Sequence, residues 1–125
     1  MELAGRRGGI REPMSALYRP FDVVAVSIGE AEANRRPALI VSTPEFERST
    51  GLVWVVMITA ADKDHRFGDV PVADQTAAGL PAPSTIRASK LATLAVAKIK
   101  RRLGALGEAD RAGARIALRA AAGFF

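Results

Sequence analysis

The sequence predicts a mainly β fold, either a barrel or a sandwich, that ends in one α-helix. Apolar runs of strand length, rich in valine and isoleucine, follow one another from residue 22 and are separated by polar segments that contain glycine. Residues 108–122 instead place small apolar residues at three- and four-residue spacings, as amphipathic helices do. The length of 125 residues fits a single domain.

The first 17 residues are expected to form a flexible arm, ahead of a domain that we place at residues 18–125. They show no periodicity and contain Gly8, Gly9 and Pro13. The arginines of this arm are not followed by an apolar segment, so no secretory signal is expected. No run in the sequence approaches the length of a membrane span.

Strands are predicted at residues 23–26, 38–42 and 52–59, because each segment is an apolar or β-branched run of strand length. A further strand at residues 68–73 alternates in polarity. Its Pro71 indicates an edge or a bulge, since proline donates no ladder hydrogen bond.

Residues 84–87 and 91–99 are expected to supply one or two more strands, although the second segment could equally be helical because it contains good helix formers. The helix over residues 108–122 has acidic residues in its first turn and arginines toward its end, which suits the helix dipole. We expect its apolar face to pack against the sheet. The residues of that predicted face are Ala109, Ala112, Ile116 and Ala120.

The net charge of +5 comes from the two ends of the chain, because the middle is slightly acidic. The basic C-terminal segment is either a solvated helix face or a surface for a polyanion, such as nucleic acid or an acidic protein segment. The chain has no cysteine, which excludes disulfides, thiolate catalysis and thiolate metal sites. A reducing cytoplasm is the expected location.

The composition excludes several kinds of catalytic chemistry. A single histidine rules out a paired-histidine mechanism within one chain, and no cluster has metal-ligand spacing. No glycine-rich phosphate loop is present, so we expect neither a metal nor a cofactor. What remains is an arginine at the start of one apolar strand, Arg36, and a hydroxyl at the end of the next, Thr59. Together they could hold a phosphate. Alternatively, Arg36 pairs with Glu30, Glu32 or Glu45, and Thr59 is an ordinary strand residue.

Five motifs occur along the chain in an order that resembles the MazF/PemK toxins of bacterial toxin–antitoxin systems. They are Arg-Pro-Phe-Asp-Val-Val-Ala-Val at 19–26, Arg-Arg-Pro-Ala-Leu-Ile-Val-Ser at 35–42, Met-Ile-Thr at 57–59, Pro-Ser-Thr-Ile-Arg at 83–87 and the segment 100–106. The resemblance implies an SH3-like β-barrel with a C-terminal helix, usually a homodimer. It also implies metal-independent cleavage of single-stranded RNA at short sequences, and neutralisation by an antitoxin with an acidic, disordered segment.

Carried over by motif, the catalytic residues are Arg36, directly before Pro37, and Thr59. In such enzymes the 2′-hydroxyl of the substrate attacks the adjacent phosphate and leaves a cyclic phosphate and a free 5′-hydroxyl. His65 is a candidate substitute base if its loop reaches the groove. The further candidates for RNA binding are Ser84, Arg35, His65, Arg66 and Arg87.

The chain departs from the family pattern at two places. Phe21 stands where these toxins usually have glycine, and Ser27-Ile28-Gly29 replaces the usual acidic, aromatic and proline sequence. The loop at residues 27–35, which helps to gate the RNA groove in the family, is therefore expected to differ in shape. Two other functions remain open. One is a barrel that only binds a protein target, as the gyrase poison CcdB does, and the other is a general RNA-binding module.

Overall fold

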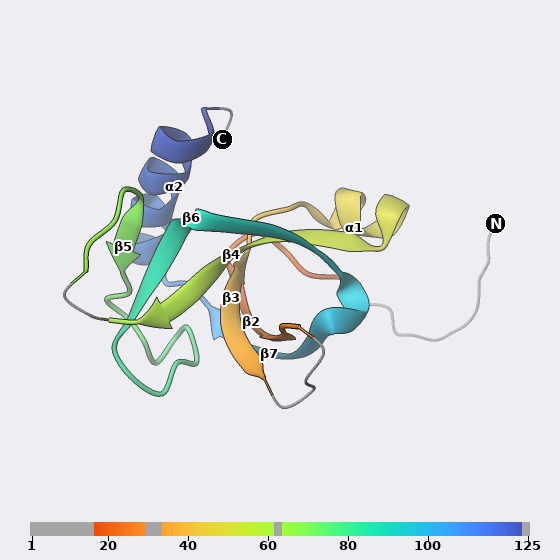
Figure 1. Cartoon of the computed structure of the whole chain (residues 1–125), viewed down its shortest axis with the longest axis horizontal. Helices are drawn as coiled ribbons and strands as arrows, with labels where there is room; N and C mark the ends of the chain where they lie inside the picture. Colours follow the sequence, from red (N-terminus) through yellow and green to blue (C-terminus); the bar gives the residue numbers. More distant parts are fainter. Residues whose placement is uncertain (1–16, 30–33, 62–63, 124–125) are drawn as a thin grey trace.

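The structure is a computed structural model that describes residues 17–29, 34–61 and 64–123. Within these residues the chain forms six strands and two α-helices (Figure 1). The strands are β2 (Asp22–Ser27), β3 (Arg35–Ile40), β4 (Leu52–Ala60), β5 (Asp69–Pro71), β6 (Ser84–Ala95) and β7 (Ile99–Ala105). The helices are α1 (Pro44–Thr50) and α2 (Glu108–Ala122), and a 3₁₀ turn, η3 (Val96–Lys98), joins β6 to β7. The predicted arm, apart from its last residue, lies outside the described residues.

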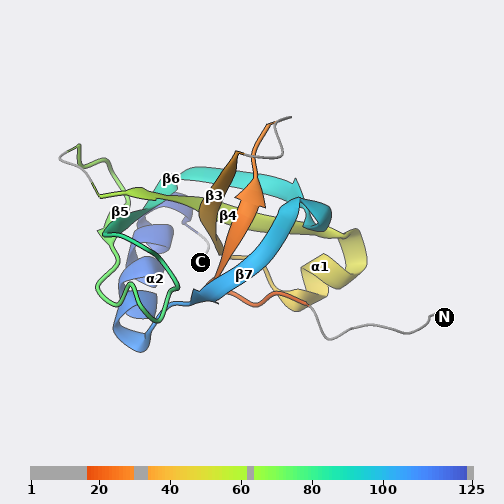
Figure 2. The same cartoon turned by 90° about the horizontal axis from the view of Figure 1, so that it is seen from below.

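All six strands belong to one antiparallel sheet with the order β5-β6-β4-β3-β2-β7. The sheet is strongly curled, with α2 at the end that carries β5 and α1 at the opposite end (Figures 1 and 2). The prediction of a mainly β fold with a C-terminal helix is confirmed. In the described part of the chain, the strand pairings leave β5 and β7 as two edges and do not close the sheet.

Strands β2, β3 and β4 are buried on both faces over most of their length, which explains why they are continuous apolar runs rather than alternating ones. One face forms a core with α2, which we call the helix-side core; it includes Leu39, Ile58 and, from α2, Leu118. The other face forms a second core, called here the far-side core, which includes Ile40 and Val55. Along β3 and β4, successive apolar residues therefore contact alternate cores.

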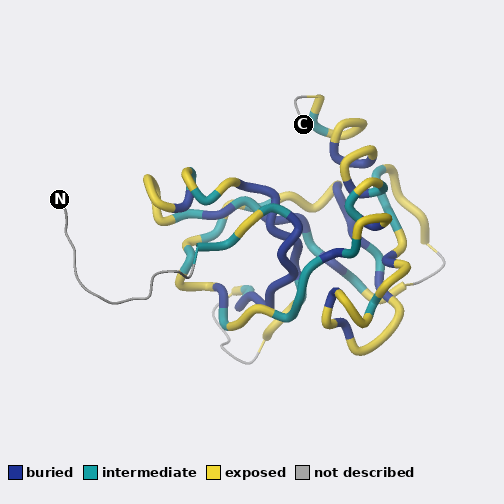
Figure 3. Tube along the Cα trace, turned by 180° about the vertical axis from the view of Figure 1, so that it is seen from behind, coloured by how far each residue is buried: buried dark blue, intermediate teal, exposed yellow. Residues whose placement is uncertain are grey.

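The face of α2 that packs against the sheet is not the predicted one. The predicted residues Ala109, Ala112, Ile116 and Ala120 are exposed. In Figure 3 the C-terminal helix shows both exposed and buried stretches along its length. The buried residues are Asp110, Ala114, Ala117 and Leu118. Alanine occurs on both faces of this helix, so its spacing alone could not select the buried face. The buried face is instead determined by Leu118 and by the buried carboxylate of Asp110. This carboxylate accepts hydrogen bonds of 2.9 Å from the backbone N–H groups of Ala73 and Asp74.

Three segments differ from the predictions in extent or type. The segments at 84–87 and 91–99 lie mostly in one long strand, β6, and the following strand β7 was not predicted. Helix α1 occupies a segment that was expected to be a polar loop. Its start has a clear signal, because the Thr43 hydroxyl caps the N–H of Phe46 at 3.2 Å and Pro44 follows directly. The edge position that Pro71 indicated for β5 is confirmed.

A tight turn at residues 19–22 starts the sheet. The N–H of Asp22 donates to the carbonyl of Arg19 at 3.0 Å, with Pro20 at the second position of the turn. Phe21, at the third position, has φ of +77° and is the one non-glycine residue in the described part of the chain with a positive φ. This geometry is that of a type II turn, whose third position favours glycine.

Candidate functional site

Strands β3 and β4 bring Arg36 and Thr59 to opposite sides of one gap in the sheet. Their pairing is antiparallel, with Ala38 opposite Met57, and ends there. Two residues further, the same register places Arg36 across from Thr59. At this point β3 remains paired with β2, and β4 remains paired with β6, so β3 and β4 separate. The two residues therefore lie at the same end of the sheet, on either side of this gap.

A groove opens where β3 and β4 separate, with a volume of about 680 Å³. Both Arg36 and Thr59 line it, together with residues of β2, β7 and the loop 79–83. Its apolar part includes Pro37, Ile58 and Leu103. The residues that line it, all within the described part of the chain, include arginines but no aspartate or glutamate. The groove is therefore suited to an anionic ligand that also has apolar surface.

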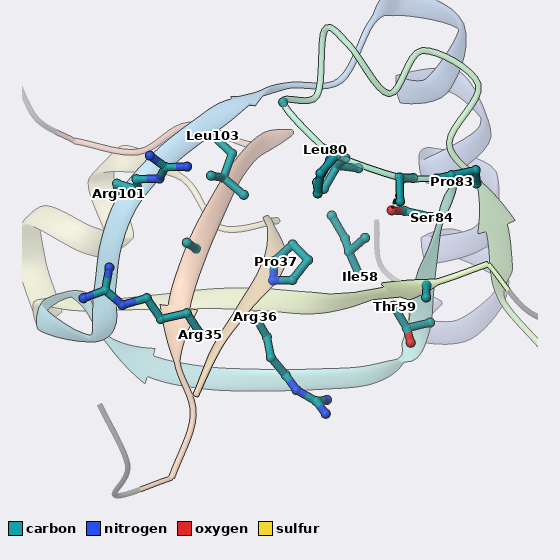
Figure 4. Close-up of a pocket in the computed structure, with 15 residues that line it drawn as sticks. Arg35, Arg36, Pro37, Ile58, Thr59, Leu80, Pro83, Ser84, Arg101 and Leu103 are labelled. Atoms are coloured by element: carbon teal, nitrogen blue, oxygen red, sulfur yellow. Dashed lines mark hydrogen bonds between the residues drawn. The ribbon is translucent and has the colours of Figure 1, made fainter. Parts of the chain in front are cut away.

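The two neighbouring arginines of β3 point to opposite faces of the sheet because side chains alternate along a strand. Arg35 and Pro37 share the face of the helix-side core, whereas Arg36 shares the face of the far-side core with Ala38. In Figure 4, Arg35 and Arg101 extend to the same side of the groove, while the Arg36 side chain points away from them. The Thr59 hydroxyl points to the same side of β4 as the Arg36 guanidinium does (Figure 4).

Arg35 and Arg36 are exposed and have no ion pair with any residue that the structure describes. The alternative pairing of Arg36 with Glu45 is thus not formed. Glu30 and Glu32, the other two alternatives, lie outside the described residues. Two uncompensated guanidinium groups beside one groove make this end of the sheet electropositive.

The model of the PemK-like, MazF-like toxins of type II toxin–antitoxin systems matches residues 19–121 of this chain. The chain belongs to the PemK/MazF toxin family. No curated protein is significantly similar to it in sequence.

Solved structures of this family share the fold. An endoribonuclease from a mycobacterial species, in complex with its cognate antitoxin, has a TM-score of 0.69 and 23% identity over 86% of this chain and 97% of its own. The Mycobacterium tuberculosis toxin MazF-mt6 has a TM-score of 0.64 and 23% identity over 79% of this chain and 93% of its own. MazE-MazF from Deinococcus radiodurans gives a TM-score of 0.70 and 20% identity over 87% of this chain and 99% of that chain.

The remaining RNA-binding candidates lie in different places. Ser84 lines the groove but is buried, and its hydroxyl donates to the carbonyl of Ala82 at 2.8 Å. This hydrogen bond fixes the turn that enters β6. His65 and Arg66 are exposed on the loop between β4 and β5 and do not line the groove.

Arg87 is buried and also lies away from the groove. Its Nε and Nη2 atoms donate to the two carboxylate oxygens of Asp69 at 3.1 and 2.9 Å. The same Nη2 donates to the carbonyl of Asp64 at 3.2 Å, and Asp69 accepts from the N–H of Arg66 at 2.9 Å. The hydrogen bonds from Arg87 hold the pKa of the Asp69 carboxyl below its usual value. This ion pair therefore anchors the loop that carries His65.

Two residues that line the groove, Arg101 and Leu80, were not identified as candidates from the sequence. Arg101 comes from β7, a strand that the sequence pattern did not reveal, and Leu80 comes from an irregular loop. The loop has a detectable signal in its glycines. Gly79 has φ of +71°, and a Cβ there would collide with the backbone carbonyl of Leu103 in β7. The loop thus packs backbone to backbone against β7, which fixes Leu80 in the groove.

No three histidine, aspartate or glutamate side chains of the described residues gather in a group that could hold a metal ion. Neither described helix has the length and apolar character needed to cross a membrane.

Proposed function

We propose that this chain is the toxin of a type II toxin–antitoxin system and that it acts as a metal-independent endoribonuclease on single-stranded RNA. The strand register supports this function, because it sets Arg36 opposite Thr59 at the edge of a groove whose described lining contains no carboxylate. Family membership and the fold shared with a mycobacterial endoribonuclease support it. The curled sheet would then correspond to an SH3-like barrel.

The proposed reaction is a transesterification within the RNA. The 2′-oxygen attacks the adjacent phosphorus, and the bond from phosphorus to the 5′-oxygen breaks. The 2′-hydroxyl loses its proton to solvent, and the leaving 5′-oxygen takes up a proton from solvent. The products are a 2′,3′-cyclic phosphate and a 5′-hydroxyl. Negative charge accumulates on the non-bridging oxygens, where the planar donor fork of Arg36 is suited to stabilise it. Thr59 donates a hydrogen bond to the same phosphate.

We assign Arg36 to electrostatic stabilisation rather than to proton abstraction. A guanidinium is a very weak acid and keeps its proton near neutral pH. His65 is exposed and outside the residues that line the groove, so a role as base would require its loop to move. Removal of one positioned donor to a developing oxyanion lowers the rate by about 100- to 1000-fold.

The partners we propose are single-stranded RNA, a cognate antitoxin and a second copy of the chain, in the cytoplasm. Antitoxin binding is supported by the related endoribonuclease that was solved with its own antitoxin. An acidic, disordered antitoxin segment would be attracted by the arginines of the groove.

The test is incubation of the purified full chain with a long single-stranded RNA in excess chelator, followed by mapping of the product ends. We expect discrete cuts with cyclic phosphate ends, reduced at least about 100-fold in Arg36→Ala and Thr59→Ala. Arg48→Ala, which removes an exposed arginine of α1, is the matched control and should cut as the wild type does. Intact RNA with folded, antitoxin-free wild type would instead favour a protein that only binds a target.

A further inference from the structure

The groove has a cationic side that the proposed catalytic pair does not use. Arg35 and Arg101 are both exposed, and neither guanidinium group has an ion pair or hydrogen bond to any residue that the structure describes. They extend to the same side of the groove in Figure 4, on the opposite face of β3 from Arg36.

Strand pairing explains why the groove is hollow between these two arginines. Ala25 of β2 pairs with Pro37 of β3 on one side and with Arg101 of β7 on the other. The alanine side chain is only a methyl group, so it leaves space between Pro37 and Arg101. Leu103 and Leu80 border the same space. The result is an apolar floor with a guanidinium at Arg35 and another at Arg101.

This combination fits one nucleotide better than a carboxylate-rich peptide. A nucleotide has a flat, largely apolar base and a phosphate on either side, which match an apolar floor flanked by two cations. An acidic peptide would present carboxylates throughout and would gain little from Pro37 and Leu103. The groove also continues directly to Arg36 and Thr59, which line the same hollow.

We propose that the groove between Arg35 and Arg101 holds a nucleotide adjacent to the scissile phosphate, with its base on the floor formed by Ala25, Pro37 and Leu103. Arg35 and Arg101 hold the flanking phosphates and position the strand, while Arg36 and Thr59 contact the phosphate that reacts. The inference rests on the proposed ribonuclease function and deepens it, because the shape of the floor then selects the base beside the cut.

The phosphate contacts are tested by binding under conditions where cleavage is impossible. The probe is a random-sequence 12-mer of fully 2′-fluoro RNA, which lacks the attacking hydroxyl, and its dissociation constant for the full chain is measured by fluorescence anisotropy over a range of salt concentrations. Each phosphate contact to a single strand contributes about 0.7 to the slope of log K against log salt. We expect Arg35→Ala and Arg101→Ala each to reduce the slope by about this amount. Arg48→Ala, the matched control, should leave the slope unchanged.

The base contact is tested with an abasic 12-mer of equal charge and with Ala25→Leu, which fills the floor. The wild type should bind the abasic oligomer about tenfold more weakly than the 2′-fluoro RNA, because burial of roughly 50 Å² of apolar base surface is worth this factor. In Ala25→Leu that difference should disappear. Thermal unfolding of each variant verifies that it is folded. Leu103→Ser serves as a second variant of the floor, and it too should bind the two oligomers equally.

Unchanged salt slopes in both arginine variants would overturn the proposal, as would equal binding of the two oligomers by the wild type. Tighter, Arg35-dependent binding of a 12-residue polyglutamate peptide than of RNA would also overturn it, in favour of a protein ligand. The failure of the proposed function is separable from these outcomes. Cleavage of natural RNA with unchanged slopes would refute this inference alone, whereas altered slopes without any cleavage would refute the ribonuclease.

Discussion

Phe21 occupies a turn position that favours glycine, and its side chain compensates for the backbone strain. Its φ of +77° belongs to the left-handed region, which costs a residue with a Cβ about 1–2 kcal/mol. The phenyl ring offsets this cost because it is buried in the helix-side core. The guanidinium groups of Arg111 and Arg115 lie 5.8 and 4.9 Å from the ring centre. The aromatic side chain thus links the first turn to α2.

Two substitutions at Phe21 separate the strain from the packing. Phe21→Ala loses the ring but keeps the strain, so we expect a loss of about 3–5 kcal/mol in the free energy of unfolding. Phe21→Gly loses the same ring but relieves the strain, so it should be about 1 kcal/mol more stable than Phe21→Ala. Urea unfolding measures both. An alanine variant more stable than the glycine variant would show that the turn adopts another geometry.

The ion pair of Asp69 and Arg87 predicts a pH dependence with a definite sign. The pKa of Asp69 is lowered in the folded state, so its ionised form contributes stability above the ordinary pKa of 3.8, and this contribution disappears as the pH falls through the folded value. Asp69→Asn should cost roughly 3 kcal/mol near neutral pH, because it leaves a buried guanidinium without its carboxylate.

The difference in stability between wild type and Asp69→Asn should remain constant from pH 7 to about pH 5 and should shrink below pH 3.8. Urea unfolding at a series of pH values measures it. If the difference grew as the pH fell, the pKa of Asp69 would be raised rather than lowered in the folded state.

At the scale of elements, what the sequence could predict depended on how far local residues determine each segment. The apolar runs of β2, β3 and β4 were recognisable because both of their faces are buried. Strand β7 was not, because its Lys100, Arg101 and Arg102 are charged and its place at the sheet edge depends on pairing with β2. The buried face of α2 was predicted wrongly because its selection depends on Asp110 and the distant Ala73 backbone.

The loop at residues 74–83 gives a prediction about glycine. A Cβ at Gly104 of β7 would run into the carbonyl oxygen of Ala77 and would lie 2.7 Å from the carbonyl carbon of Ala78. Gly104→Ala should therefore push this loop away, lower the free energy of unfolding by about 2 kcal/mol and weaken RNA binding, because Leu80 leaves the groove.

Gly113 of α2 is the control for this prediction. A Cβ there would lie 3.4 Å from Cγ1 of Val70, an acceptable contact, and alanine is a better helix former. Gly113→Ala should leave RNA binding unchanged and raise stability by about 0.5–1 kcal/mol. Thermal unfolding and anisotropy measure both variants. Equal stability of Gly104→Ala and wild type would show that the loop does not depend on its close approach to β7.

In the whole molecule, some basic residues of the C-terminal segment make contacts that stabilise the fold, whereas another lines the groove. Arg102 pairs with Asp22 at 3.0 Å, and Arg111 donates to the carbonyl of Leu106 at 2.9 Å. Arg101 instead lines the groove. The sequence showed the excess of basic residues but not which of them stabilise the fold and which line the groove, because this depends on the direction in which each side chain points in the folded chain. Arg36 and Thr59 are proposed as site residues from the family motifs, whereas the groove that they line became visible only in the fold.

We propose that Arg36 and Thr59 act together on one phosphate. A double-mutant cycle of Arg36→Ala, Thr59→Ala and the double variant tests it, with single-turnover RNA cleavage rates in excess chelator as the measurement. We predict that each single variant is slower by at least about 100-fold and that the double variant is hardly slower than the slower single one. Independent, multiplicative losses, or a wild type that leaves the RNA intact, would show that the two residues do not act together on one phosphate.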